Sequence, residues 1–367
     1  MVRGWATSPD GRHHGAHYAE AAQALGTRPD GFLDFSANIN PLGAPEAALA
    51  AGVDALYGEA GRYPDLHYTE LRAALAGYLG VPPDRVLPTN GGAEALFLAA
   101  RTAAEESARK KAVVLEPTFS EYAAAARAAG FEVERVVARR PETAFQLDLA
   151  VLDDALAGRR GVGLVFLCNP NNPTGDAVSR REVLRVAERV REAGAVLVVD
   201  EAFTDFAPHL SVAREAGERV YVARSFTKFF AVPGLRLGCL ITRETERVRA
   251  FQPSWPVNAV AAAVGIVAAV DESFTEATLA EVALRRRELF SALGGLPELT
   301  PYPGAANFLL VRGPEGLAEE LARRGVLVRG CEPFRGLGPG FFRVAVRGTG
   351  ENERLVEELR SMLGGTP

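Results

Sequence analysis

Residues 163–175 read GLVFLCNPNNPTG, an apolar run followed by a turn rich in asparagine and proline. Because polar residues do not alternate with the apolar ones, the run predicts a strand buried on both faces of a sheet. Ser179 comes just before residues 183–190, whose apolar positions recur at helical spacing, so we expect it to cap a helix. A buried strand, a turn and an amphipathic helix in this order predict one unit of a parallel α/β sheet.

The same alternation extends in both directions along the chain. Helical patterns separate most of the remaining apolar runs, for example at residues 120–129. The runs predict strands at AVVLEP (112–117), FEVERVV (131–137), AVLVVDEA (195–202), VYVARSF (220–226) and GCLIT (238–242). The sequence therefore predicts an α/β fold, in which a large domain carries a mainly parallel sheet covered by helices on both faces.

After about residue 250 the pattern changes. An alanine-rich helical region continues to Leu293, and shorter strands such as NFLLVRG (307–313) and FFRVAVR (341–347) follow, which together predict a smaller α+β domain. The expected division is residues 1–50 for an N-terminal arm and part of the small domain, residues 51–255 for the large cofactor domain, and residues 256–367 for an interdomain helix and the rest of the small domain.

The composition is that of a globular protein. Of the 367 residues 48% are hydrophobic and 24% are charged, and the net charge of -5 argues against nonspecific binding to nucleic acid. Three scattered cysteines without a CxxC pair argue against a metal site or a disulfide framework and favour a reducing, cytoplasmic location. The N-terminal residues lack the apolar core of a signal peptide, and the longest near-apolar run, residues 259–270, is too short to span a membrane.

Lysine is rare in this chain, with three residues beside 38 arginines. Lys110 and Lys111 lie in a polar run that predicts a solvated turn, whereas Lys228 lies among apolar residues in SFTKFFAVPGLRLG (225–238). Arginine neither forms an imine nor readily loses its proton, and lysine does both. Lys228 is therefore either a catalytic amine or a lysine whose stem packs on apolar surface while its ammonium reaches water.

Two further segments follow predicted strands, at the place where open α/β sheets bind ligands. TNGGAEAL (89–96) is a glycine-rich turn that begins a helix, and the N-terminus of a helix attracts anions. VVDEAF (198–203) places Asp200 at the end of a buried strand, where a carboxylate needs a cation or a hydrogen-bond donor. Each of these segments, like the asparagine-rich turn, also has a plain structural explanation.

The segment around Lys228 adds Ser225 and Arg236, which could hold a phosphate group next to the lysine. Pyridoxal phosphate (PLP) is one ligand that satisfies all four segments. It has an aldehyde for a lysine, a ring nitrogen for a carboxylate, a ring hydroxyl for an asparagine and a phosphate for the helix N-terminus. Each segment fits by chance fairly easily, whereas the four segments in this order do not.

The order and spacing of these segments resemble the aspartate-aminotransferase-type (fold type I) PLP enzymes over essentially the whole chain. The resemblance implies that Lys228 forms the Schiff base with the cofactor, that Asp200 pairs with the ring nitrogen and that Asn172 hydrogen-bonds the ring hydroxyl. Phe119 is implied to stack on the ring face. The residues implied to hold the phosphate are Gly92, Ala93, Ser225 and Arg236.

Two positions of the same resemblance concern the partner and the substrate. Tyr63, in RYPDLHY (62–68), corresponds to the residue that reaches the cofactor phosphate of the partner subunit, which implies a homodimer. Arg343 takes the position that binds the substrate α-carboxylate with two hydrogen bonds.

Two neighbouring families of this group catalyse different reactions: histidinol-phosphate aminotransferase and the threonine-phosphate decarboxylase of cobalamin synthesis. HHGAHYAEAAQALG (13–26) and FLDFSANINPLGAP (32–45) look like the opening motifs of the decarboxylase. The aminotransferases usually have a tyrosine at the position of Phe203, where its hydroxyl bonds the ring hydroxyl. The resemblance thus implies PLP-dependent decarboxylation of L-threonine O-3-phosphate to (R)-1-aminopropan-2-yl phosphate.

For this reaction we expect the phosphorylated substrate to be bound by His14, Asn38, Arg329 and Arg343, with the division of its phosphate and carboxylate among them left open. The bond that breaks at Cα must stand perpendicular to the cofactor ring, so this clamp selects the carboxylate for cleavage. Lys228 is the nearest donor for the proton that then reaches Cα. The alternatives are amino transfer to 2-oxoglutarate and a PLP-fold protein that has lost catalysis and serves as a binding module.

Overall fold

A computed structural model describes residues 18–26, 28, 31–157 and 161–364. Its largest sheet has seven strands, six of which run in one direction while β8 is antiparallel to both of its neighbours. This sheet confirms the predicted α/β class with a mainly parallel sheet. Its strands, in spatial order, are β2 (Val86–Asn90), β8 (Leu237–Ile241), β7 (Val220–Ser225), β6 (Val196–Asp200), β5 (Val162–Cys168), β3 (Lys111–Glu116) and β4 (Glu132–Val137).

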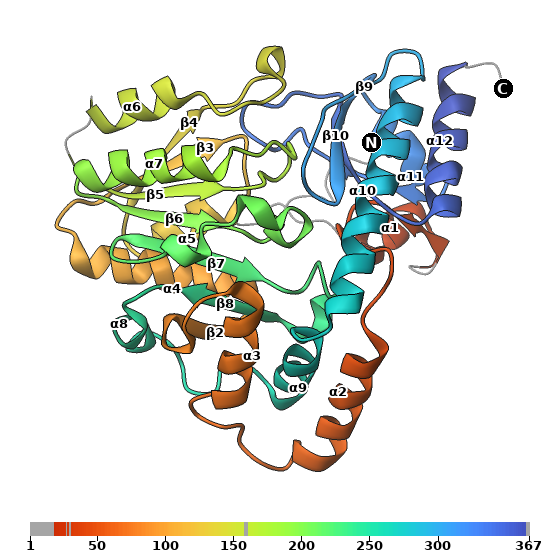
Figure 1. Ribbon diagram of the computed structural model, residues 1–367. Coiled ribbons are helices and arrows are strands. Elements are labelled where there is room, and N and C mark those ends of the chain that lie inside the picture. Colours follow the sequence, from red (N-terminus) through yellow and green to blue (C-terminus); the bar gives the residue numbers. More distant parts are fainter. Residues whose placement is uncertain (1–17, 27, 29–30, 158–160, 365–367) are drawn as a thin grey trace.

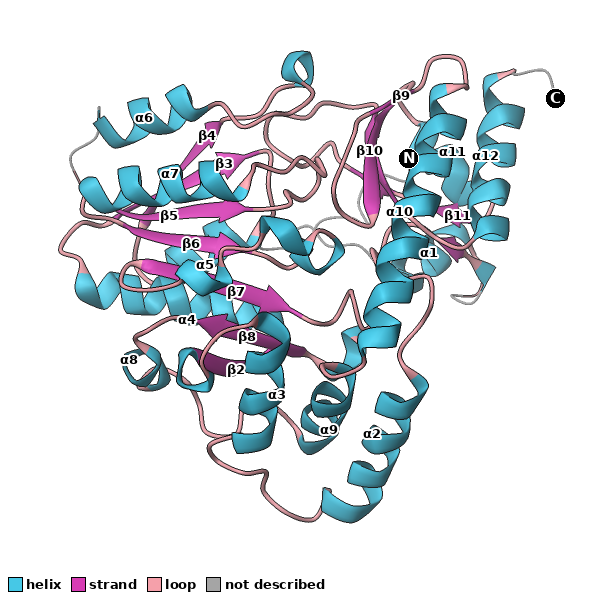
Figure 2. Cartoon of the chain, in the orientation of Figure 1, coloured by secondary structure: helices cyan, strands magenta, loops and turns pink. Residues whose placement is uncertain are grey.

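Helices cover both faces of this sheet (Figure 2). Residues of β5 alternate between the two cores: Val165 and Leu167 pack with one set of helices, while Leu164 and Phe166 pack with the other. This explains why the strand is apolar without polar alternation. One face carries α3 (Thr69–Leu79), α6 (Leu149–Ala157), α7 (Arg180–Glu192) and α9 (Ala259–Ala268), and the other carries α4 (Gly91–Glu106), α5 (Glu121–Ala128) and α8 (Thr245–Arg249).

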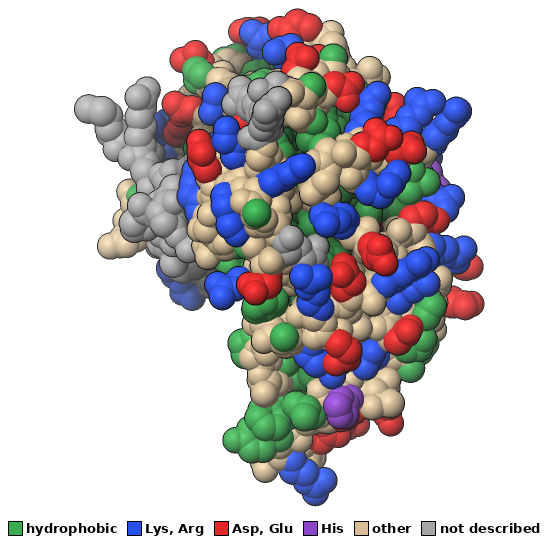
Figure 3. All heavy atoms as spheres, turned by 90° about the vertical axis from the view of Figure 1, so that its left-hand side faces the viewer, with side chains coloured by type: hydrophobic (Ala, Val, Ile, Leu, Met, Phe, Trp, Pro, Cys, Tyr) green, Lys and Arg blue, Asp and Glu red, His purple; other side chains and the backbone are tan. Residues whose placement is uncertain are grey.

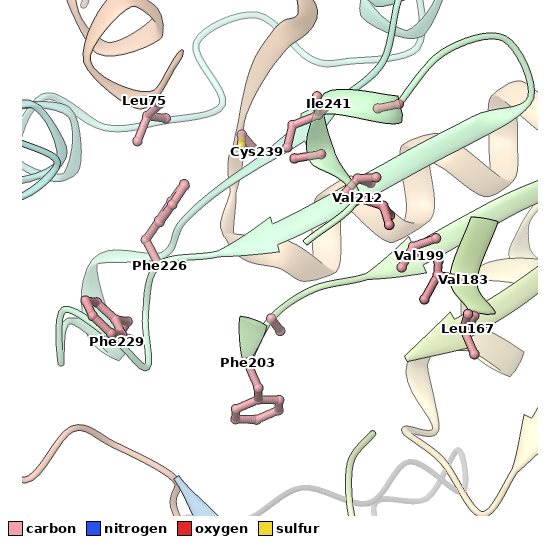
Figure 4. Close-up of a cluster of buried hydrophobic side chains, with 14 of the residues drawn as sticks. Leu75, Leu167, Val183, Val199, Phe203, Val212, Phe226, Phe229, Cys239 and Ile241 are labelled. Carbon is pink, nitrogen blue, oxygen red and sulfur yellow. The ribbon is translucent and has the colours of Figure 1, made fainter. Parts of the chain in front are cut away.

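The first of these cores extends to the edge of the sheet where the site lies. Figure 4 shows Phe203, Phe226 and Phe229 in the same core as Leu167 of β5, Val199 of β6 and Ile241 of β8. On α7, Ser179 Oγ accepts a hydrogen bond from the backbone N–H of Glu182, and the Glu182 carboxylate accepts one from the N–H of Ser179, which confirms the predicted helix start.

A second, four-stranded sheet is antiparallel throughout. Its strands, in spatial order, are β12 (Arg329–Gly330), β13 (Phe341–Ala345), β10 (Phe308–Arg312) and β9 (Thr300–Pro301). The short strand β1 (Leu33–Asp34) pairs in parallel with β11 (Val326–Leu327), which places the segment after α1 (Tyr18–Leu25) beside this second sheet. The helices of this part are α10 (Glu272–Gly294), α11 (Leu317–Arg323) and α12 (Thr349–Leu363).

The helical region predicted after residue 250 is two helices rather than one. α9 ends at Ala268, and α10 begins after Asp271, whose carboxylate caps it by accepting a hydrogen bond from the N–H of Phe274 at 2.9 Å. Figure 1 shows α10 passing from the seven-stranded sheet to the four-stranded one. The predicted boundaries at residues 50 and 255 stay a prediction. The first of them falls inside α2 (Glu46–Glu59), which packs on α9.

The surface mixes charged side chains of both signs over much of one face, as Figure 3 shows. Hydrophobic side chains gather on this face at its lower end, where α2 and the connection to α3 lie in Figure 1. Among the residues described, no helix is both long and apolar enough to cross a membrane.

Candidate active site

The carboxyl ends of the parallel strands open into a cavity of about 450 Å³ that also faces β12 and β13. This volume is within the range of sites for small ligands. The predicted site residues that line it are Asn38, Gly92, Ala93, Phe119, Asn172, Asp200, Ser225, Lys228, Arg236, Arg329 and Arg343. Tyr63 does not line it and is 79% exposed, and His14 lies outside the described residues.

Lys228 is half-buried in the turn that follows β7. Its Nζ donates a hydrogen bond to Ser225 Oγ at 2.9 Å, and its backbone carbonyl accepts one from the N–H of Asn40 at 3.0 Å. Burial lowers the pKa of the amine to about 8, although the charge of Asp200 acts in the opposite direction. The cavity therefore holds an amine that is far easier to deprotonate than an ordinary lysine.

Asp200 ends β6 and is 6% exposed. Its Oδ1 accepts a hydrogen bond from the N–H of Ala202 at 2.9 Å, and its Oδ2 accepts one from the hydroxyl of Tyr122 at 2.7 Å. Burial raises the pKa of this carboxyl group, while the hydrogen bond from Tyr122 and the charge of Lys228 lower it. Asp200 is thus a carboxylate fixed by two donors at the wall of the cavity.

The N-terminus of α4 forms an anion-binding corner with Arg236. Gly91 begins this helix with a φ of 73°, and a Cβ there would lie 2.7 Å from Nη2 of Arg236. Only glycine allows the guanidinium to approach the helix so closely. Ser225 and the first turn of α4 complete the corner, since a Cβ on Gly92 would lie 3.0 Å from Cβ of Ser225.

Arg329 and Arg343 occupy facing positions on β12 and β13, and both are buried. Arg343 donates hydrogen bonds to the Asn172 side-chain oxygen and, at 2.8 Å, to the carbonyl of Ser36. Burial lowers the pKa of Arg343 to about 10, and the charge of Arg329 acts in the same direction. Two guanidinium groups side by side in one cavity form a site for an anion, or for two anionic groups of one ligand.

Two packed phenylalanine rings each contact one cation of this site, Lys228 or Arg343. Lys228 Nζ lies 5.7 Å from the centre of the Phe203 ring, which packs edge-on against Phe308 with centres 5.0 Å apart. The guanidinium of Arg343 lies 5.1 Å from the centre of the Phe308 ring. These cation–π distances keep both cations beside aromatic faces without neutralising them.

The chain belongs to the aminotransferase class I and II family, whose model matches residues 30–359. It is 39% identical to the threonine-phosphate decarboxylase of Salmonella typhimurium over 361 residues, which cover 96% of this chain and 97% of that protein. It is 32% identical to the histidinol-phosphate aminotransferase of Methanopyrus kandleri over 370 residues, which cover 94% and 91%. These relatives confirm the predicted resemblance.

The solved structure of the histidinol-phosphate aminotransferase from Clostridium acetobutylicum has a TM-score of 0.80 and 26% identity to this chain. The match covers 91% of this chain and 99% of that one. It confirms that the two sheets belong to one known architecture, as the predicted fold class required.

Several cavity residues were not predicted from the sequence. Glu121 and Tyr122 line the cavity from the start of α5, and Ser36 lines it from the segment after β1. Asn40 is 2% exposed and holds the turn of Lys228 without lining the cavity. Tyr122 has no local signal of its role, because a tyrosine near the start of a helix is ordinary and its partner Asp200 lies far away in the sequence.

Proposed function

We propose that this protein is a PLP-dependent enzyme whose cofactor occupies the cavity described above. The residues present fit the group. The carboxylate of Asp200 would pair with the ring nitrogen, the corner formed by α4, Ser225 and Arg236 would hold the phosphate, and Phe119 would lie on the ring face. The side-chain oxygen of Asn172 accepts a hydrogen bond from Arg343, so Nδ2 is the Asn172 group that would hydrogen-bond the ring hydroxyl. When bound, PLP supplies an electron sink for a bond broken at Cα.

We further propose that the reaction is the decarboxylation of L-threonine O-3-phosphate to (R)-1-aminopropan-2-yl phosphate, in cobalamin biosynthesis. The observation that carries this proposal is the pair of buried guanidinium groups, Arg329 and Arg343, in the same cavity as Lys228. The substrate brings a carboxylate and a phosphate, which match two fixed cations. Asn38 lines the same cavity, and His14 is proposed to join them.

The clamp on the two anionic groups and the side chain of Phe203 favour this reaction over amino transfer. Holding the substrate by its two anionic groups fixes which bond at Cα stands perpendicular to the ring. Once carbon dioxide has left, the amine of Lys228, with its lowered pKa, delivers a proton to Cα. The apolar ring of Phe203 offers no hydroxyl to the ring oxygen of the cofactor, which leaves Asn172 as its partner.

We also propose that the protein acts as a cytoplasmic homodimer. Its three cysteines are free, which supports a reducing compartment. The exposed hydrophobic residues around α2 form what we name the apolar surface: Leu42, Leu49, Val53, Leu56, Tyr57, Tyr63, Leu66 and Trp255. Contiguous exposed apolar side chains of this kind are typical of a protein interface. Tyr63 stacks on Trp255 within this surface, with ring centres 4.4 Å apart, and is available to a partner subunit.

The reaction is tested by incubating the purified protein with PLP and L-threonine O-3-phosphate without any keto acid. We expect release of carbon dioxide and formation of aminopropanol phosphate, both abolished in Lys228→Ala. Arg329→Gln and Arg343→Gln should weaken substrate binding by about tenfold or more, because each removes a charged hydrogen-bond donor. If no carbon dioxide is released and the protein instead transfers the amino group of histidinol phosphate to 2-oxoglutarate, the proposed decarboxylase activity is wrong and the protein is an aminotransferase.

A further inference from the structure

Tyr122 is a fully buried tyrosine in direct contact with Asp200. It is the second residue of α5, whose first two residues line the cavity, and its hydroxyl lies 2.7 Å from Asp200 Oδ2. Its ring is stacked on Phe166 with centres 5.2 Å apart and meets Phe119 edge-on at 5.7 Å. Tyr122 therefore contacts both the carboxylate proposed for the ring nitrogen and the phenylalanine proposed for the ring face.

The direction of this hydrogen bond is fixed by the two groups. Burial raises the pKa of Tyr122 well above its ordinary value, and the negative charge of Asp200 adds to this effect, so the phenol keeps its proton and donates it. An ionised carboxylate oxygen has two lone pairs, so Oδ2 can accept from Tyr122 and still accept a further N–H. The charges of Lys228 and Arg224 and the N–H of Ala202 also favour the carboxylate of Asp200.

We propose that Tyr122 is a positioning residue that keeps the proton on the ring nitrogen of the cofactor rather than on Asp200. This inference rests on the proposed PLP function. A proton shared between a carboxylate and a ring nitrogen goes to the nitrogen when the carboxylate is stabilised as an anion. Tyr122 supplies that stabilisation inside an apolar core, where a hydrogen bond to a charged group is strong.

The decisive measurement is the ¹⁵N NMR shift of ring-labelled PLP bound to the full-length protein. In the wild type we expect the position of a protonated ring nitrogen, and in Tyr122→Phe a move toward the unprotonated position. Tyr122→Phe should also weaken PLP binding by about tenfold, because a carboxylate that has lost this donor pairs less strongly with a protonated ring nitrogen. The rate constant kcat should fall by a similar factor while KM changes little, since the substrate anchors are untouched.

The matched control is Tyr221→Phe. Tyr221 is also fully buried, and its hydroxyl donates to the carboxylate of Glu244 at 3.0 Å, but it does not line the cavity. This variant should leave the ¹⁵N shift and the affinity for PLP unchanged. A PLP analogue with carbon in place of the ring nitrogen should bind equally well to the wild type and to Tyr122→Phe, because it has no nitrogen to protonate.

A double-mutant cycle of Tyr122→Phe with Asp200→Asn completes the test. If Tyr122 acts through Asp200, the double variant should bind PLP no more weakly than Asp200→Asn alone. An unchanged ¹⁵N shift in Tyr122→Phe, or additive losses in the double variant, would overturn the role of Tyr122. Failure of the wild type to bind labelled PLP at all would instead overturn the proposed function.

Discussion

Lys228 shares its cavity with charged groups of both signs, which act on the pKa of its amine in opposite directions. Burial lowers its pKa from 10.5 to about 8, the charge of Asp200 raises it, and the charge of Arg236 lowers it further. Only the neutral amine attacks an aldehyde. The rate at which the apoprotein captures pyridoxal, which lacks the phosphate, should therefore rise with pH through about 8 and level off above it. Stopped-flow absorbance measures this rate.

Two variants should move the inflection of this pH profile in opposite directions. Asp200→Asn removes a negative charge that favours the ammonium, so the inflection should move to lower pH. Arg236→Gln removes a positive charge that disfavours the ammonium, so it should move to higher pH. Lys228→Ala should show no capture. An inflection at the ordinary lysine value of 10.5 in the wild type would show a fully solvated amine instead.

Among individual residues, the sequence predicted those that lie at the end of a strand or just after it. Asp200 and Lys228 could be found because a charged residue among apolar ones needs a reason to be there. Asn40 and Tyr122 could not be found in this way. Both act through hydrogen bonds to residues far away in the sequence, and asparagine next to proline or tyrosine in a helix is ordinary. Their partners become visible only when the elements are assembled.

Among the elements, the apolar runs predicted the strands of the large sheet well, because burial on both faces leaves a strong pattern. The break between α9 and α10 was missed because alanine-rich helices on both sides give no change of period, and the capping aspartate is the single local signal. The short strands β1 and β11 pair across almost 300 residues and are only two residues long, too short for any periodic pattern.

One interaction between elements carries its own prediction. Asn40 Nδ2 donates to the carbonyl of Phe229 at 2.7 Å and to Oγ1 of Thr278 on α10 at 2.9 Å, so it ties the turn of Lys228 to this helix. Asn40→Ala should lower the free energy of unfolding by about 2–3 kcal/mol, because it removes several buried hydrogen bonds. Thr278→Val should lower it by about 1 kcal/mol. Urea unfolding of the apoprotein gives both values.

The two losses should not add, because the variants share one hydrogen bond. Thr275→Val on the same helix is the control: within the described part of the chain its hydroxyl bonds only the local carbonyl of Asp271, so it should not couple to Asn40→Ala. Full additivity of Asn40→Ala and Thr278→Val would show that the turn and α10 are held together by other contacts.

For the whole molecule, the cavity depends on how two separate sheets face one another, and no local pattern predicts this. The cofactor side is made by strand ends within one sheet, so topology indicates where its residues meet, while the family resemblance assigned their roles. The substrate side brings together Asn38, from the segment after β1, with Arg329 and Arg343 on the second sheet. The resemblance to a known family, rather than composition or periodicity, supplied these three residues.

The apolar surface around α2 gives the last prediction, which concerns the assembly. Val53 and Leu56 are each 53% exposed on one face of α2. Val53→Glu should therefore place a charge in the proposed dimer interface at a cost of about 3 kcal/mol and yield monomers in sedimentation velocity. Val270→Glu, at an exposed valine outside this surface, should leave the dimer intact. Since Tyr63 is proposed to reach the partner's cofactor phosphate, the monomer should also bind PLP more weakly. A dimer that persists in Val53→Glu would place the interface elsewhere.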